Sequence, residues 1–458
     1  MTYANRNVLI IGAGRQGQAL ARYLSRQGAR VTLNDRRPPE ALEAARRALA
    51  ELPLRWETGG HPLALLDDCD LVCPSGGVPL DLPLVQEAVR RGIPLSNDSQ
   101  IFLEAAPCKV VGITGSAGKT TTTTLVGRMG RAGWQTGRVW VGGNIGNPLI
   151  ADVEAMQPGD LAVMELSSFQ LEVMTRSPQV AAVLNVTPNH LDRHGTMEAY
   201  TAAKARILDF QTPQDVAVLN REEPGSRGLA GHTRGRLLTF GERQPPQREA
   251  GTWLSPEGWL TFQGAEGSQR RLLPQSLIRL RGRHNLDNCL AAAAIALAAG
   301  LPPEAVRAGI ENFTGVPHRL ELVRTWRGVA WYNDSIATAP ERAMAAIRSF
   351  DEPLVLLAGG RDKKLPWDDF AALVRQRVDH LIVFGEAADL IARAVGRGGE
   401  RPYTLHRCEG LHEAVEQAAA VAEAGDVVLL SPGGTSFDEF RDFAERGEKF
   451  RAWVQALA

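Results

Sequence analysis

The sequence predicts an α/β protein of more than one domain, in which strands of parallel sheets alternate with helices. Its length of 458 residues exceeds the size at which a single hydrophobic core stops growing, so two or three domains are expected. A glycine-rich strand–turn–helix pattern stands near the N-terminus, and a second glycine-rich turn follows the apolar segment 109–113. Both patterns are typical of parallel α/β sheets.

Composition excludes several classes of partner. Hydrophobic residues make up 44% of the chain, charged residues 22%, and the formal net charge is -1, which argues against nucleic acid or a membrane surface. The five cysteines are scattered without metal-binding spacing, as in proteins of a reducing cytoplasm. No signal-peptide pattern opens the chain and the apolar run 290–301 is too short to span a bilayer, so we expect a cytoplasmic protein.

The first block reads as a dinucleotide-type fold. An apolar strand at 7–11 leads into the turn Gly12-Ala-Gly-Arg-Gln-Gly17, a helical pattern to 27, and a second strand at 30–34. Asp35 follows that strand, where an acid could hold a ribose hydroxyl.

Further short elements continue the alternation. We expect strands near 70–73 and 94–95 and a helix at 82–91. The segment 75–78, Ser-Gly-Gly-Val, is either another turn facing phosphate or an ordinary glycine turn, and the sequence favours neither.

The second block opens with a nucleotide-triphosphate clamp. Segment 112–124 places glycines at 112, 115 and 118, followed by Lys119 and a run of threonines. Backbone N–H groups and the start of the next helix would face phosphate, Lys119 would reach the terminal phosphates, and Thr120 would reach Mg²⁺. The usual P-loop template has glycine where this chain has Ile113, so the clamp is a variant.

Two more strands of this block end in polar groups. Glu165 ends the apolar run 160–165, and His190 follows the run 180–185. Ligands sit at the carboxyl ends of parallel strands, so both residues should face the P-loop. A carboxylate there suits magnesium. A lone histidine is more often structural than a ligand, but the position of His190 after a buried strand makes the two interpretations equal.

The rest of the chain supplies a hairpin, two helices and a third block. Alternation at 253–262 predicts a β-hairpin, and helices are expected at 284–299 and 303–312. The third block starts near 316 with a hairpin around 326–328. Strands then alternate with helices, the strands lying at 353–358, 380–384 and 426–430.

Ten short motifs, in the same order along the chain, resemble the ATP-dependent Mur ligases of peptidoglycan synthesis. The resemblance covers nearly the whole chain, and the variant glycine spacing is the one these ligases use. The motifs lie at 114–120, 142–146, 165–171, 185–193, 203–204, 282–288, 318–319, 333–335, 359–363 and 431–443.

The resemblance implies three domains, each α/β. Residues 1–100 would form a Rossmann-like domain for the UDP end of the substrate, 101–315 a central P-loop ATPase-like domain, and 316–458 a Rossmann-like domain for the incoming amino acid. The implied enzyme is an amide ligase that adds D-glutamate to UDP-N-acetylmuramoyl-L-alanine, acts as a monomer and uses ATP and Mg²⁺. ATP would phosphorylate the substrate carboxylate, and the amine would attack the acyl phosphate through a tetrahedral intermediate.

The resemblance also implies roles for individual residues. Catalysis would rest on Lys119, His190 and Lys204, and Mg²⁺ on Thr120, Glu165, His190 and a carbamylated Lys204. ATP would be met by Gly115, Ser116, Ala117, Gly118, Lys119, Thr120, Thr121, Asn285, Asn288, Arg319 and Asp334. On sequence alone, Lys204 is a lysine on a helix at 197–210, and a solvated face is the simpler interpretation.

The resemblance also implies which residues contact the two substrates. The UDP substrate would contact Arg15, Gln16, Asp35, Arg36, Ser75, Asn144 and His190, and D-glutamate would contact Thr338, Lys363, Ser436, Phe437 and Phe443. The chain departs from the family pattern near the glutamate: many relatives carry Asn-Asp-Ser-Lys-Ala-Thr-Asn where this chain has Ile336 and Ala339, and glycine where it has Lys364.

Three other functions compete with the ligase. A nicotinamide-dependent dehydrogenase fits the first block but leaves the P-loop unexplained. A GTPase switch or ATP-driven motor fits the P-loop, yet the chain has no guanine-reading Asn-Lys-x-Asp run. A sister ligase that adds another residue mostly lacks this combination of the turn 12–17 with Ser436-Phe-Asp.

Overall fold

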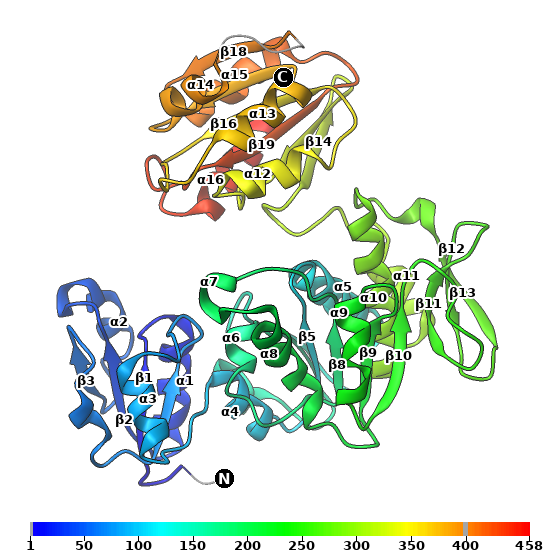
Figure 1. Ribbon diagram of the computed structural model, residues 1–458. Coiled ribbons are helices and arrows are strands. Elements are labelled where there is room, and N and C mark those ends of the chain that lie inside the picture. The colour runs from blue at the N-terminus through cyan, green and yellow to red at the C-terminus, as the bar shows by residue number, and fades with distance from the viewer. Residues whose placement is uncertain (1–2, 397–401) are drawn as a thin grey trace. The chain divides into compact units, whose positions relative to one another are not determined.

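The computed structural model describes residues 3–396 and 402–458. Its contacts divide the chain into two compact units. The first comprises Met1–Arg279 and Arg283–Phe313, and the second comprises Leu280–Gly282 and Thr314–Ala458. Three sheets, two in the first unit and one in the second, carry the helices around them (Figure 1).

The N-terminal sheet has four parallel strands in the order β3-β2-β1-β4. The strands are β1 (Asn7–Ile11), β2 (Arg30–Asp35), β3 (Arg55–Thr58) and β4 (Leu71–Pro74). The helices of this region are α1 (Arg15–Arg26), α2 (Glu43–Ala48), α3 (Pro83–Arg90) and α4 (Asp98–Ala105), with 3₁₀ turns at Pro39–Leu42 and Leu63–Leu66.

The predicted strand at 94–95 forms only as an isolated bridge. Leu95 makes a single parallel bridge to Val72 and no strand forms there. The sequence analysis also missed β3, whose residues are all partly or fully exposed, so the apolar run that marks a buried strand is missing. The turn, α1 and β2 are confirmed.

The central sheet has nine strands in the order β13-β12-β11-β10-β9-β8-β5-β7-β6. The strands are β5 (Lys109–Thr114), β6 (Val139–Gly143), β7 (Leu161–Glu165), β8 (Val180–Val183), β9 (Val216–Asn220), β10 (Arg236–Phe240), β11 (Ala250–Leu254), β12 (Trp259–Gln263) and β13 (Gln269–Pro274). Strand β12 is antiparallel to both of its neighbours, β11 and β13, and all other pairs are parallel, so the predicted hairpin is confirmed as β11–β12.

Helices pack around this sheet. They are α5 (Lys119–Gly133), α6 (Ser168–Leu171), α7 (Leu191–His194), α8 (Met197–Asp209), α9 (Pro224–Arg227), α10 (Arg283–Ala299) and α11 (Pro303–Ile310), with 3₁₀ turns at Leu149–Ala151, Val153–Ala155, Gly228–His232 and Gln275–Leu277. Helix α10 is buried on nearly every side, which explains its alanine content. No helix within the described residues is both long and apolar enough to cross a membrane.

The order of the central sheet positions the P-loop. Strand β5 lies between β8 and β7, although neither follows it directly in the chain. Ligands of open α/β sheets bind beyond the carboxyl ends of strands where the order reverses. The loops after β5, β7 and β8 therefore share one edge of the sheet.

The C-terminal sheet has six strands in the order β14-β15-β19-β16-β17-β18, and all pairs except β14–β15 are parallel. The strands are β14 (Glu321–Trp326), β15 (Val329–Asn333), β16 (Leu354–Gly359), β17 (His380–Phe384), β18 (Thr404–Cys408) and β19 (Val427–Gly433). The helices are α12 (Pro340–Ile347), α13 (Asp368–Arg377), α14 (Ala388–Val395), α15 (Leu411–Val421) and α16 (Phe443–Ala456).

The predicted hairpin between β14 and β15 is confirmed. Trp326 pairs with Val329, and the two turn residues Arg327 and Gly328 have φ of 51° and 80°. Two positive φ values suit the right-handed twist of the flanking strands. The fold class, α/β with mostly parallel sheets, is as the sequence predicts.

Candidate functional site

The loop between β5 and α5 needs its third glycine. Gly118 has a φ of 82°, in the left-handed region, and a Cβ built on it would stand 2.2 Å from Asn288 Oδ1. Any other residue would meet both the backbone strain and this close approach. The shifted glycine of the variant clamp is therefore required where it stands.

Side chains from the segment after β8 hold the loop in shape. The Ala117 N–H donates to Asn185 Oδ1 (2.8 Å), and Asn185 Nδ2 donates to the Ala117 carbonyl (3.2 Å). Ser116 Oγ donates to the Thr187 carbonyl (2.9 Å) and accepts from the Tyr200 hydroxyl (3.0 Å). Asn185 and Tyr200 are thus parts of the clamp that sequence reasoning gave no role.

The predicted metal-side residues on β7 and α5 meet directly. Thr120 Oγ1 donates to Glu165 Oε2 (2.9 Å), and Asn144 Nδ2 donates to Glu165 Oε1 (2.8 Å). Glu165 is 1% exposed. Lys119 Nζ lies over the loop and donates to the Gly115 and Ser116 carbonyls at 2.8 and 3.3 Å.

These donors fit Mg²⁺ by their chemistry. The ion prefers oxygen ligands such as the Thr120 hydroxyl and the Glu165 carboxylate, which already lie side by side. Residues 3–396 and 402–458 contain no group of three or more His, Cys, Asp or Glu side chains that could hold a metal by themselves. Substrate phosphate and water oxygens would have to complete the coordination.

Lys204 is buried, contrary to the solvated face that its position on a helix suggested. It is 1% exposed, its Nζ lies 3.5 Å from Thr114 Oγ1 and 4.6 Å from the centre of the Tyr200 ring. Burial, with the nearby charge of Lys119, lowers the pKa of Lys204 to about 6. Most of this amine is therefore neutral at pH 7.

His190 stands at the start of α7 with a φ of 53°, and its side chain is exposed. Its ring meets Phe169 edge-on with the centroids 5.1 Å apart. The buried histidine of this region is His194, which sequence reasoning missed. Its Nε2 lies 3.0 Å from Ser168 Oγ, its Nδ1 3.1 Å from Glu172 Oε1, and its ring stacks on Phe169.

Six of the seven residues predicted for the UDP substrate line one cavity. The cavity has a volume of about 710 Å³ and draws on the turns after β1, β2 and β4 and on the loop after β6. The six residues are Arg15, Gln16, Asp35, Arg36, Ser75 and Asn144. The seventh, His190, is not among the lining residues, whereas Arg37 and His61, which sequence reasoning did not select, are.

Asp35 accepts hydrogen bonds on both carboxylate oxygens. The Ala13 N–H donates to Oδ2 (2.9 Å), and the Arg37 guanidinium donates to Oδ1 (3.0 Å) and Oδ2 (2.8 Å). Burial alone would raise the pKa of Asp35, but the hydrogen bonds from Arg37 and from backbone N–H groups outweigh it and hold the pKa well below its usual range. Asp35 therefore stabilises the turn and orients the Arg37 side chain.

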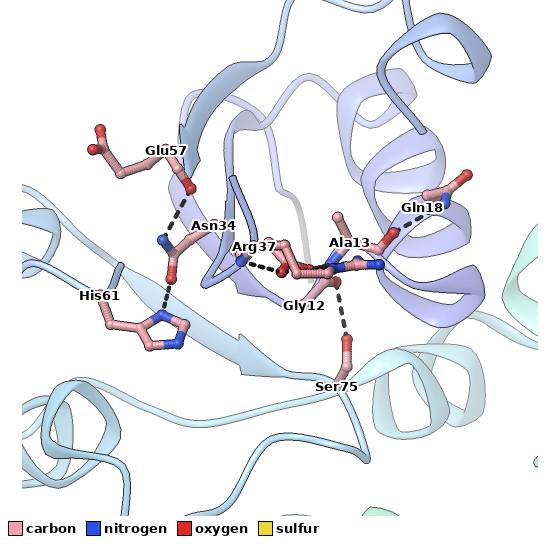
Figure 2. A network of polar contacts seen from close by, with 9 residues as sticks. Gly12, Ala13, Gln18, Asn34, Arg37, Glu57, His61 and Ser75 are labelled. Carbon is pink, nitrogen blue, oxygen red and sulfur yellow. Dashed lines mark hydrogen bonds and ion pairs between the residues drawn. The ribbon is translucent and has the colours of Figure 1, made fainter. Parts of the chain in front are cut away.

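The turn itself is packed against its helix. A Cβ on Gly17 would lie 1.9 Å from the Gly12 carbonyl oxygen, so α1 approaches β1 as closely as glycine permits. Ser75 Oγ donates to the same Gly12 carbonyl (3.2 Å), as Figure 2 shows, and Asn34 Oδ1 lies 2.6 Å from His61 Nδ1. The segment after β4 thus contacts the glycine turn directly.

The residues predicted for ATP fall in both units. Asn288 Nδ2 donates to Asn285 Oδ1 (3.0 Å), and Thr122 Oγ1 donates to Asn288 Oδ1 (3.4 Å), so these amides lie beside the start of α5. Arg319 and Asp334 belong to the second unit. Burial raises the pKa of Asp334 to about 7, although Ser431 Oγ donates to it at 2.8 Å.

The residues predicted for D-glutamate all lie in the second unit. Lys363 Nζ donates to Thr338 Oγ1 (3.2 Å), so these two residues meet. Ser436 is buried, whereas the neighbouring Phe437 is 60% exposed. The Phe443 carbonyl accepts from Ser335 Oγ (2.8 Å), and its ring meets His318 edge-on. Within the described residues, no hydrogen bond joins Ser436 or Phe437 to Lys363.

The chain has close relatives over its full length. It is 44% identical to a protein of Symbiobacterium thermophilum over 98% of both chains, and 41% identical to one of Pelotomaculum thermopropionicum over 99% of this chain and 98% of the other. Both are named UDP-N-acetylmuramoylalanine–D-glutamate ligase. The chain belongs to the Mur ligase family. The resemblance seen in its motifs is thereby confirmed.

Family models and solved structures agree. A Mur ligase MurD-like N-terminal domain matches residues 6–97 of this Mur ligase, a Mur ligase middle domain matches 113–296, and a Mur ligase, glutamate ligase domain matches 318–434. The fold is similar to that of UDP-N-acetylmuramate-alanine ligase from Thermotoga maritima, with a TM-score of 0.57 at 19% identity over 98% of this chain and 99% of the other.

Proposed function

We propose that this Mur ligase joins D-glutamate to UDP-N-acetylmuramoyl-L-alanine with the hydrolysis of ATP to ADP and phosphate. The substrate carboxylate takes the terminal phosphoryl group of ATP and becomes an acyl phosphate. The glutamate amine attacks that carbonyl, and the tetrahedral intermediate expels phosphate. The relatives that match nearly the full length of the chain carry the name of this reaction, which supports the choice among sister ligases.

One chain of contacts in the first unit carries the proposal. Asn144 lines the large cavity, and its amide donates to Glu165, whose other oxygen accepts from Thr120 at the start of α5. A UDP-linked substrate in the cavity would thus end beside the residues that hold the ATP phosphates. A dehydrogenase or a motor has no use for this connection.

The neutral amine of Lys204 suits its proposed modification. An unprotonated amine adds to CO₂ and loses a proton to form a carbamate, which turns a cation into an anionic oxygen ligand. The nearby Lys119, whose charge opposes protonation of Lys204, would favour the anion. With one Mg²⁺ held by Thr120 and Glu165 and a second beside the carbamate, the ions would neutralise charge on the transferring phosphoryl group.

The remaining residue roles are also proposals. They are ATP contacts by Asn285, Asn288, Arg319 and Asp334, a second Mg²⁺ contact by His190, and D-glutamate contacts by Thr338, Lys363, Ser436, Phe437 and Phe443. We also propose domain limits near residues 100 and 315, a monomer and a cytoplasmic location.

Phosphate release tests the proposed function. The purified chain is given ATP, Mg²⁺ and UDP-N-acetylmuramoyl-L-alanine, with D-glutamate, L-glutamate or no amino acid. We expect release only with D-glutamate. Release without any amino acid would favour a motor, and activity with L-glutamate alone would reject the proposed stereochemistry.

A further inference from the structure

A second cation stands beside the pair Lys363–Thr338. Thr338 precedes Ala339, the residue that caps α12, and Arg342 is the third residue of that helix. The Arg342 N–H donates to the Ala339 carbonyl (3.1 Å), so Arg342 belongs to the first turn, immediately after the loop that carries Thr338. Lys363 reaches the same loop from the segment after β16 through its bond to Thr338 Oγ1 (3.2 Å).

The Arg342 guanidinium is exposed and uncommitted. Within residues 3–396 and 402–458, no hydrogen bond or ion pair of this side chain is found. Arg361, in the segment after β16, is by contrast bound to Glu386 through two nitrogens at 2.8 and 2.9 Å. An unpaired arginine beside a lysine is available for an anion.

The Arg342 charge acts on Lys363 and on one acid, Asp334. Burial lowers the pKa of Lys363 and the Arg342 charge lowers it further, which places the guanidinium within electrostatic reach of the amine. The Arg342 charge also acts on Asp334, but that carboxyl is buried and accepts a hydrogen bond from Ser431. Because the Asp334 carboxyl is already hydrogen-bonded to Ser431, it does not neutralise Arg342 and Lys363.

The charge of the substrate matches this arrangement. Glutamate with the free amine needed for attack carries two carboxylates, and one lysine neutralises only one of them. Ile336, where many relatives carry lysine, is half-buried and offers no charge. The guanidinium of arginine binds a carboxylate through two parallel hydrogen bonds, so it can replace an amine at this task.

We propose that Arg342 binds one carboxylate of the incoming D-glutamate while Lys363 binds the other. Arg342 thereby makes the site selective for a dicarboxylate and supplies the charge that Ile336 lacks. The proposal rests on the function proposed above and adds a residue that determines its amino-acid specificity.

The test is a set of KM values measured by phosphate release. We expect Arg342→Ala to raise KM for D-glutamate at least tenfold, while KM for ATP and for the UDP substrate stays within twofold. The control is Arg348→Ala, because Arg348 is an exposed arginine at the other end of the same helix. It should leave all three KM values unchanged.

A double variant tests the exchange of charge. Adding Ile336→Lys to Arg342→Ala should recover most of the lost affinity for D-glutamate. The proposal is overturned if Arg342→Ala leaves KM for D-glutamate unchanged, or if the added lysine recovers none of the loss. The wild-type protein separates the two proposals. If it shows no D-glutamate-dependent phosphate release, the proposed function itself is rejected. If it is active and Arg342→Ala has the same KM for D-glutamate, only the role of Arg342 is rejected.

Discussion

The P-loop region of the first unit and the glutamate region of the second differ in how their charges are held. Around the P-loop, Glu165 is bound by Thr120 and Asn144 and is 1% exposed, and Lys204 is buried to the same degree. In the glutamate region, Lys363 donates to the Thr338 hydroxyl and Arg342 is exposed.

The difference follows from what each region must do. Phosphoryl transfer needs groups fixed before the reaction, because charge develops there and a site that must reorganise loses rate. Capture of a small, highly charged amino acid needs cations that solvent and substrate can reach. Substitutions in the first region should therefore change turnover, and those in the second should change affinity or local stability.

The largest effect is expected from Lys119→Met. Removing the lysine that would reach the transferring phosphoryl group should lower kcat by about 10³-fold. Phosphate release at saturating substrates measures it. Lys449→Met is the control, because that lysine lies exposed on α16, and it should keep full activity. A small loss in Lys119→Met would contradict the view that this region is built for charge stabilisation.

The next effect is expected from Lys204→Ala. Loss of the carbamate oxygen ligand should lower kcat by roughly 10²-fold. Millimolar acetate or propionate should restore part of the rate, because a small carboxylate can enter the space and supply the oxygen. Full activity of the variant, or a loss that no carboxylate restores, would contradict carbamylation.

A pH-dependent stability effect follows from the same lysine. Its pKa falls to about 6 in the folded chain from 10.5 in the unfolded chain, so between these values the unfolded chain binds more protons. Stability should therefore rise with pH through this window. In CO₂-free buffer, Lys204→Met should raise the free energy of unfolding at pH 7 by roughly 2 kcal/mol and flatten the rise. Urea unfolding at pH 6, 7.5 and 9 measures both, and parallel profiles for the two proteins would argue against a buried neutral amine.

The smallest effect is expected in the second unit, from Lys364→Gly. Lys364 has a φ of 58°, where a side chain is strained, which accounts for the glycine of many relatives. The substitution should raise the free energy of unfolding by about 0.5 to 1 kcal/mol in urea titrations. Lys449→Gly, within α16, should instead lower it by about 1 kcal/mol. If both variants lose stability, the strain at Lys364 is not real.

Much of the site was predictable because its chemistry is local. Short runs of consecutive residues determine the strand–turn–helix units β1–α1 and β5–α5. The same holds for the strand ends that carry Glu165 and Asp35. The burial of Lys204 had a signal that was not used: Tyr200, Lys204, Ile207 and Leu208 share one helical stripe, and all are buried. A lysine on an apolar stripe predicts an amine with a lowered pKa.

Other features had no local signal. Strand β3 is exposed at a sheet edge and carries no apolar run, so only pairing with β2 defines it. The partner of Asp35 is Arg37, but the sequence cannot show that the chain turns back so that this guanidinium meets the carboxylate. Asn185 holds the P-loop across 68 positions of sequence.

The sequence by itself determined the family, the α/β class and the positions of the glycines, lysines and acids that phosphoryl transfer needs. Only the tertiary structure decided their surroundings: that burial lowers the pKa of Lys204, that both oxygens of Asp35 accept hydrogen bonds, and that Arg342 lies exposed near Lys363. The reason is physical, since a pKa and a hydrogen-bond partner depend on burial and on residues distant in the chain.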